Sequence, residues 1–296
     1  MKTTLPEFPV EHAVENVTVE SDLLDAAEVR EYLALLDLPW RSPSIDALNE
    51  LVTAHVTRVP FENISKLYYK NQFGLTRLPS IEEYLQGIEQ YHFGGTCYSN
   101  NFRFYTLLKS LGYEVKLCSA DMATPHVHMV SIVEFDHGEY LADTGYAAPF
   151  LLPLPRFLKT DHVVALGRDR YVLKPQDASG RSRLELYRDG LLKHGYVVNP
   201  APRRFADFSK VIADSFRKNA TFLNSILLAR FFPGHSLVIH NFSVIESWRN
   251  RSVVYAMEDK SELIAAMEEH FGIPSSVVTT ALSDLGPLVD AWGGQP

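Results

Sequence analysis

The stretch Gly94-Gly95-Thr96-Cys97 precedes a run of apolar residues that ends at a glycine: Phe102, Tyr105, Leu108, Leu111 and then Gly112. This three-residue spacing predicts a helix that begins near Cys97 and is capped by Gly112. A cysteine in the first turn of a helix lies where unpaired backbone N–H groups and the helix dipole favour an anion. We therefore consider Cys97 a candidate nucleophile, with a buried structural cysteine beside a tight turn as the alternative.

A nucleophilic cysteine needs a general base, and the base needs an orienting group. His126 and His128 stand at the start of an apolar strand and are expected to share one of its faces, and Asp143 follows in the next strand. With a hairpin turn at residues 136–139, Asp143 would lie opposite Ile132, which is four residues, roughly 13 Å, from His128. A contact between His128 and Asp143 would then require a bulge, a bend or a longer connection.

Four stretches resemble, in order, the motifs of the arylamine N-acetyltransferases: Val59-Pro60-Phe61-Glu62-Asn63-Ile64, Gly94-Gly95-Thr96-Cys97, His128-Met129-Val130-Ser131-Ile132-Val133 and Ala142-Asp143-Thr144-Gly145-Tyr146. The spacing of 15 positions between His128 and Asp143 also agrees with the family. The resemblance is good over residues 30–150 and loose in the C-terminal third. It implies a catalytic triad of Cys97, His128 and Asp143, with His128 rather than His126 as the base.

The resemblance also implies an activity. The chain would be an acyltransferase that moves an acetyl or other acyl group from acyl-CoA, through a Cys97 thioester, to an arylamine, hydrazine or hydroxylamine nitrogen or oxygen. Acetyl-CoA would be a cosubstrate, with no permanently bound cofactor and no metal. Phe61, Tyr98, Phe102 and Tyr146 are the candidate substrate-binding residues, although core packing is the commoner role of such rings.

Charge for the CoA phosphates would come from a basic group, for which an ordinary solvated face is the alternative. Its members are Arg203, Arg204, Lys210, Arg217 and Lys218.

The resemblance also implies an α+β fold, with a helical bundle, an antiparallel β-barrel and an α/β lid. Residues 1–112 would form an N-terminal extension and the bundle, residues 113–208 the barrel, and residues 209–296 the lid. The residue pattern agrees with this division. Ser44 and the Ser80…Glu83 pair are predicted helix starts, because such residues cap backbone N–H groups. Short runs rich in Val, Ile, Tyr and Leu follow Gly112 and are typical of antiparallel strands.

Three departures from the family pattern bear on the activity. Phe93 stands where the family has arginine, and Tyr98-Ser99-Asn100 differs from the usual residues after the cysteine. Tyr146-Ala147-Ala148-Pro149 replaces a glycine-containing loop that lets the backbone approach a ligand closely. An amide synthase for a larger acyl chain, a hydrolase, and a catalytically silent homologue that acts as a binding module are therefore kept as alternatives. A zinc site of Cys118, His126, His128 and His137 is the least favoured hypothesis, since the spacing fits no familiar closed site.

Composition limits the partners. The 296 residues carry a formal charge of -8 at pH 7 and the pI is about 5.8, which argues against binding to nucleic acid or to an anionic membrane. No window approaches 18 consecutive apolar residues, and the N-terminal stretch has acidic residues where a signal peptide would be basic. Two cysteines are too few for a secreted disulfide scaffold. We expect a cytoplasmic protein whose partners are a small aromatic amine and acyl-CoA.

Overall fold

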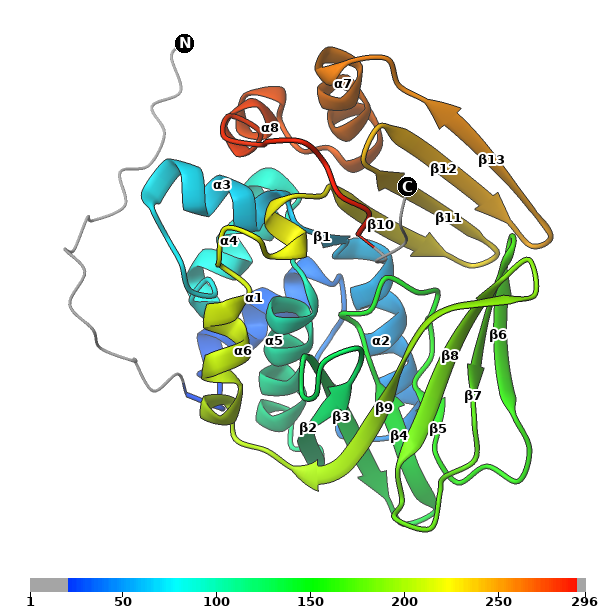
Figure 1. Cartoon of the computed structure of the whole chain (residues 1–296). Helices are drawn as coiled ribbons and strands as arrows, with labels where there is room; N and C mark the ends of the chain where they lie inside the picture. Colours follow the sequence, from blue (N-terminus) through cyan, green and yellow to red (C-terminus); the bar gives the residue numbers. More distant parts are fainter. Residues whose placement is uncertain (1–20, 292–296) are drawn as a thin grey trace.

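The first unit is a bundle of helices (Figure 1) in a computed structural model that describes residues 21–291. The predicted extension at residues 1 to about 20 lies outside the described residues. The helices are α1 (Ala26–Leu35), α2 (Ile45–Arg58), α3 (Ile64–Phe73), α4 (Ile81–Tyr91) and α5 (Cys97–Ser110). Both predicted caps are present: Ser44 Oγ accepts from Ala47 N, and Ser80 and Glu83 form a capping box.

Helix α5 is the centre of this unit, because it packs against α1 and also against two strands of the second unit, β2 (Val115–Asp121) and β3 (His128–Phe135). Eleven of its fourteen residues are buried. A helix that is buried on nearly all sides can carry polar side chains only where each finds a partner. Such a helix holds its first residue, Cys97, in a fixed place relative to both units.

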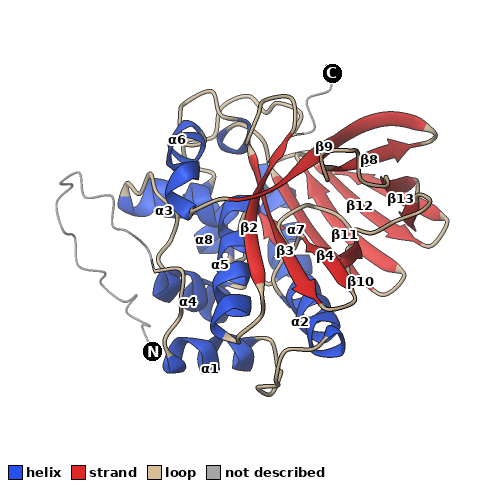
Figure 2. Ribbon diagram, turned by 90° about the horizontal axis from the view of Figure 1, so that it is seen from below, coloured by secondary structure: helices blue, strands red, loops and turns tan. Residues whose placement is uncertain are grey.

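The second unit is a strongly curved antiparallel sheet of eight strands, and its strands β2 and β3 lie beside the helices of the first unit (Figure 2). Its strands are β2 (Val115–Asp121), β3 (His128–Phe135), β4 (Gly138–Ala142), β5 (Leu154–Pro155), β6 (His162–Leu166), β7 (Asp169–Leu173), β8 (Ser182–Arg188) and β9 (Leu191–Pro202). Their order in the sheet is β5-β4-β3-β2-β9-β8-β7-β6. Apolar side chains from β2, β3, β7, β8 and β9 fill its interior.

The hairpin of β3 and β4 corrects one sequence-based expectation. Its register pairs Ser131 with Ala142 and Phe135 with Gly138, so the turn contains residues 136 and 137 only. In that register the position opposite Asp143 is Val130, two residues from His128 rather than four. Side chains on such a diagonal are within reach across a sheet. No bulge is needed, and the expected turn at residues 136–139 was too long.

The third unit follows a short helical segment that crosses from the barrel to the lid. This segment contains η1 (Phe205–Phe208), α6 (Ser209–Asp214) and η2 (Thr221–Leu223). The lid has strands β10 (Leu227–Phe232), β11 (His235–His240), β12 (Ser243–Trp248) and β13 (Arg251–Ala256), and helices α7 (Lys260–Phe271) and α8 (Ser275–Ala281). The short strand β1 (Phe61–Glu62) of the first unit pairs with β10 and so joins the lid sheet.

The helical bundle, barrel and lid confirm the α+β fold class. The lid sheet packs on α7 and α8 through apolar residues that also include Ile64 and Phe93 of the bundle. Within residues 21–291, no helix is long and apolar enough to cross a membrane.

Candidate functional site

Cys97 is the first residue of α5 and is partly exposed. The chain before it is held by a buried carboxylate: Gly94 N donates to Glu62 Oε1 (3.1 Å), and Ser65 N donates to Glu62 Oε2 (2.8 Å). Gly94 is required here, because a Cβ at this position would lie 1.9 Å from the carbonyl oxygen of Pro60. The motif around Glu62 therefore fixes the turn that presents the thiol.

His128 is the first residue of β3, and its side chain is 1% exposed. Its Nε2 lies 2.9 Å from Asp143 Oδ2, and Cys97 is close enough to the same ring to favour its protonated form. Burial opposes the protonated ring, but the charge and hydrogen bond of Asp143, together with Cys97, outweigh it and raise the pKa of His128 to about 10. With Nε2 bound to Asp143, Nδ1 is the nitrogen left for the thiol.

Asp143 directly follows β4 and is held by two residues that the sequence analysis did not identify. Asn101 Nδ2 donates to Asp143 Oδ1 (2.7 Å), and Tyr196 OH donates to Asp143 Oδ2 (2.7 Å). Asn101 Oδ1 also accepts from Gly145 N (2.9 Å). The position of Asn101, one helical turn after Cys97, is a signal that could have identified it; Tyr196 is brought in by β9 from far along the chain.

His126 lies outside β3 and does not share a strand face with His128, so that expectation was wrong. Its backbone has a positive φ of 60°, and its N–H donates to Asp121 Oδ1 (2.8 Å). Its side chain is 46% exposed, and Nδ1 is 3.0 Å from Ser119 Oγ. In this left-handed turn His126 contacts Ser119 and Asp121 of β2.

The four candidate substrate-binding residues lie at different depths. Tyr146 is half-buried, with its ring centroid 5.7 Å from that of His128. Phe61 packs edge-on against Phe222, and Tyr98 OH donates to Val127 O (2.9 Å). Phe102 is fully buried and stacks on Phe205, so a direct substrate contact of this ring would require Phe205 to move.

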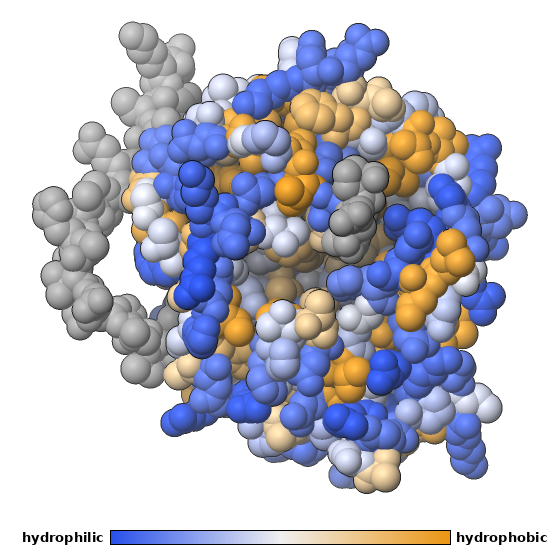
Figure 3. All heavy atoms as spheres, viewed as in Figure 1, coloured by the Kyte–Doolittle hydropathy of each residue, from blue (hydrophilic) through white to orange (hydrophobic). Residues whose placement is uncertain are grey.

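The face of the molecule that carries α6 is hollowed in its middle, beside a column of hydrophilic side chains (Figure 3). The predicted basic group belongs to the segment that crosses this face. Three of its members are paired with acids of the same segment: Arg204 with Asp207, and Lys210 and Arg217 with Asp214. These pairs reduce the positive field that the segment presents to an anion.

The sequence departures have structural explanations. Phe93 is 1% exposed and fills an aromatic cluster with Tyr68, Tyr69 and Tyr91, at centroid distances of 5.7, 5.8 and 5.2 Å. The loop after Asp143 keeps one close approach, because a Cβ on Gly145 would lie 2.8 Å from the Cα of Cys97. An apolar ring thus supports the cysteine turn where the family has a cation.

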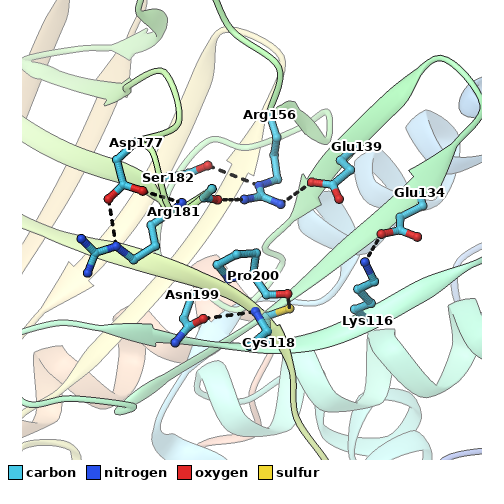
Figure 4. Close-up of polar contacts among 12 residues, drawn as sticks. Lys116, Cys118, Glu134, Glu139, Arg156, Asp177, Arg181, Ser182, Asn199 and Pro200 are labelled. Carbon is cyan, nitrogen blue, oxygen red and sulfur yellow. Dashed lines mark hydrogen bonds and ion pairs between the residues drawn. The ribbon is translucent and has the colours of Figure 1, made fainter.

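Cys118 is fully buried in the barrel, whereas Cys97 is partly exposed. Its sulfur faces the carbonyl of Pro200 at 3.7 Å (Figure 4), and burial raises the pKa of its thiol to about 12. Nearby, buried Arg156 pairs with Glu139 and donates to Ser182 Oγ (3.3 Å). In residues 21–291 no three His, Cys, Asp or Glu side chains are placed to hold a metal, so the residues of the zinc alternative do not converge there.

A cavity of about 40 Å³ lies between the barrel and lid sheets, beside Ala147, Tyr171 and Arg188. None of Cys97, His128 and Asp143 lines it. This cavity is therefore separate from the three candidate catalytic residues.

Comparisons with known proteins identify the family of the chain. A family model described as N-acetyltransferase matches residues 44–278, most of the chain. An arylamine N-acetyltransferase of Escherichia coli is 24% identical over 242 residues, which span 78% of this chain and 83% of that protein. The chain belongs to the arylamine N-acetyltransferase family. It is accordingly an enzyme, an acyltransferase of that family.

Two further relatives extend the comparison. A proansamycin X synthase of Amycolatopsis mediterranei is 24% identical over 183 residues, which span 58% of this chain and 67% of that protein. The structure of the Mycobacterium marinum arylamine N-acetyltransferase in complex with CoA has a TM-score of 0.71 to this chain at 21% identity. That likeness covers 87% of this chain and 99% of the other, and it confirms the arylamine N-acetyltransferase fold.

Proposed function

We propose that the protein transfers an acetyl group from acetyl-CoA to an aromatic amine, hydrazine or hydroxylamine, with Cys97, His128 and Asp143 as the catalytic triad. The observation that carries this proposal is the buried pair of His128 and Asp143, whose Nε2 and Oδ2 atoms lie 2.9 Å apart, with Cys97 at the start of α5 close enough to raise the pKa of the His128 ring. This is the nucleophile, base and orienting group that covalent acyl transfer requires.

The first half-reaction forms a thioester on the protein. The Cys97 thiolate attacks the acyl carbonyl, a new S–C bond forms, and the bond to the CoA sulfur breaks. The leaving thiolate takes a proton from the His128 imidazolium. In the second half-reaction the amine nitrogen attacks the Cys97 thioester and neutral His128 accepts a proton from the amine. An N–C bond forms, the S–C bond breaks, and the Cys97 thiolate leaves beside the His128 imidazolium, as at the start. Asp143 stays ionised and holds the ring in one orientation throughout.

The surrounding residues would select the two substrates. Tyr146, beside the His128 ring, and the pair of Phe61 and Phe222 would contact an aryl group, with Tyr98 at the edge of the nucleophile turn. Phe102 would act indirectly, because its ring stacks on Phe205 and holds that ring in place. The CoA named in the Mycobacterium marinum structure supports CoA as the carrier here, and Arg203 and Lys218 would meet its phosphates.

Intact mass measurement after mixing with acetyl-CoA tests the proposal. Wild-type protein should gain about 42 Da, one acetyl group, and should lose it when an arylamine is added. Cys97→Ser should gain nothing, whereas Cys118→Ser, the matched control, should still be acetylated. His128→Ala should abolish turnover and His126→Ala should not. An adduct that persists in Cys97→Ser would place the nucleophile elsewhere.

The alternatives predict different results. An amide synthase on a larger acyl chain would leave acetyl-CoA unused, and it is not favoured, since the match to the Escherichia coli arylamine N-acetyltransferase spans more of the chain than the match to the synthase. A hydrolase would release free acid without an amine. A silent homologue would form no adduct.

Three wider points stay predictions. The division into units at residues 112 and 208 is our proposal for how the chain is organised. A cytoplasmic location and the lack of nucleic-acid binding rest on charge and composition. Cell fractionation and a nucleic-acid retention assay would check the last two.

A further inference from the structure

The ring of Tyr146 contacts the candidate base and also a histidine that the proposed mechanism does not use. Its hydroxyl oxygen lies 2.8 Å from His194 Nδ1, and the planes of these two rings are 18° apart. The centroid of the same tyrosine ring lies 5.7 Å from that of His128 and 5.2 Å from that of Tyr196. Tyr146 therefore connects His194 to the candidate catalytic residues.

Strand β9 supplies two hydrogen bonds to this part of the site. His194 and Tyr196 lie on the same face of the strand, because side chains alternate and the pairing with β8 is regular across these residues. Tyr196 OH donates to Asp143 Oδ2 (2.7 Å), and His194 Nδ1 meets the hydroxyl of Tyr146 in the loop that follows Asp143. One face of β9 thus holds, at two points, the loop whose sequence departs from the family pattern.

Packing and this hydrogen bond together fix the orientation of the Tyr146 ring. The ring stacks on Phe150, with 6.1 Å between the centroids, and meets Tyr171 edge-on at 6.4 Å. Burial, aided by the charge of His128, lowers the pKa of His194, so its imidazole is neutral at neutral pH and keeps a lone pair that accepts a hydrogen bond. With its hydroxyl bound to His194, Tyr146 offers a substrate its ring rather than its polar end.

We propose that His194 is a positioning residue: by binding the Tyr146 hydroxyl, it holds that ring in the orientation that favours acceptors with an aromatic ring. This inference rests on the proposed function, in which Tyr146 contacts the aryl group of the acceptor. No covalent bond changes at either residue, and the formation of the Cys97 thioester does not depend on the pair.

Aniline and hydrazine make a pair of acceptor probes, because both present an NH2 group and only aniline has a ring. With acetyl-CoA as the donor, kcat/KM for each acceptor reports the second half-reaction alone. His194→Leu should lower kcat/KM for aniline about 3- to 10-fold, which corresponds to the loss of one neutral hydrogen bond. The value for hydrazine and the rate of Cys97 acetylation should not change. His194→Gln should recover part of the loss, since its amide oxygen can accept from Tyr146.

Tyr146→Phe removes only the hydroxyl and keeps the ring, so it should show the same selective loss. The double variant, Tyr146→Phe with His194→Leu, should be no worse than either single variant, because both changes remove the same hydrogen bond. His126→Leu, a change at an exposed histidine, is the matched control and should keep both kcat/KM values of wild type.

Additive losses in the double variant would overturn the inference, because His194 would then act independently of Tyr146. Equal losses for aniline and hydrazine would also overturn it and make the pair a general support of the fold. Normal transfer to aniline in both single variants would overturn the inference and leave the proposed function standing. A wild-type protein that forms no Cys97 adduct with acetyl-CoA would overturn both.

Discussion

Asp143 accepts three hydrogen bonds from buried groups: His128 Nε2 (2.9 Å), Asn101 Nδ2 (2.7 Å) and Tyr196 OH (2.7 Å). Its side chain is 0% exposed. A buried carboxylate is stable only when its lone pairs are occupied and a positive group is near, and the His128 ring supplies that group. The residues that hold Asp143 come from α5 and β9, so the helical unit and the barrel both fix its position.

Asp143→Asn should leave the fold intact and lower turnover on the order of 10⁴-fold, because an amide can hold the His128 ring in the wrong tautomer. Tyr196→Phe is the matched control: it removes one of the three hydrogen bonds but keeps the charge, and should cost about 10-fold or less. Steady-state rates of both variants, with circular dichroism to check folding, measure this. A near-normal rate for Asp143→Asn would leave at most a Cys97–His128 pair.

At the scale of single elements, helix α2 presents a buried imidazole to its neighbours. His55 is 0% exposed; its Nε2 lies 3.0 Å from Tyr32 OH on α1 and 3.4 Å from Tyr84 OH on α4. Its Nδ1 has no partner among the described residues. Burial lowers the pKa of His55 from 6.5 to about 3, so the ring is neutral in the folded bundle.

This imidazole should make the bundle acid-sensitive. Below pH 6.5 the unfolded chain gains a proton at His55, while the folded chain stays neutral there until about pH 3. The free energy of unfolding is therefore unaffected by His55 above pH 6.5 and decreases as the pH falls from 6.5 towards 3. The loss is at most about 5 kcal/mol. In urea unfolding, His55→Gln should show a flatter pH dependence of the unfolding free energy than wild type. His126→Gln, a change at an exposed histidine, should keep the wild-type slope; an unchanged slope in His55→Gln would contradict the prediction.

At the scale of the whole molecule, the stretch from Pro60 to Asn63 joins the nucleophile turn to the lid. Glu62 N donates to Gly95 O (3.1 Å), and β1 pairs with β10. The Asn63 amide donates to Phe222 O (3.0 Å) and Ser225 O (2.7 Å), and its Oδ1 accepts from Leu227 N (2.9 Å). One short motif therefore sets how the lid meets the turn that holds Cys97.

Asn63→Ala should lower the free energy of unfolding by about 3 kcal/mol, since it leaves buried backbone groups without partners. Asn71→Ala is the matched control: this amide also bridges to the lid, at Ala281 O (3.0 Å), but it is half-exposed, and its loss should cost about 1 kcal/mol. Thermal and urea unfolding of both variants measure the difference. Equal losses would mean that the contacts of Asn63 stabilise the connection between the nucleophile turn and the lid no more than a half-exposed amide does.

The sequence by itself predicted the helix starts and the region of antiparallel strands, because helix caps and apolar periodicity are local properties of the chain, and its motifs suggested the candidate triad through their resemblance to a family. Helices begin after Ser44 and Ser80 as predicted, and Cys97 begins α5. The pairing of strands that are far apart in the chain, such as β2 with β9, is not a local property of the sequence.

Only the tertiary structure decided how the candidate residues meet. The two-residue turn of the β3–β4 hairpin set the register that brings Asp143 to His128, and a one- or two-residue difference in a turn moves every pairing after it. Asn101 and Tyr196 carry no motif of their own. Their roles follow from contacts between elements far apart in the chain, which no local pattern in the sequence encodes.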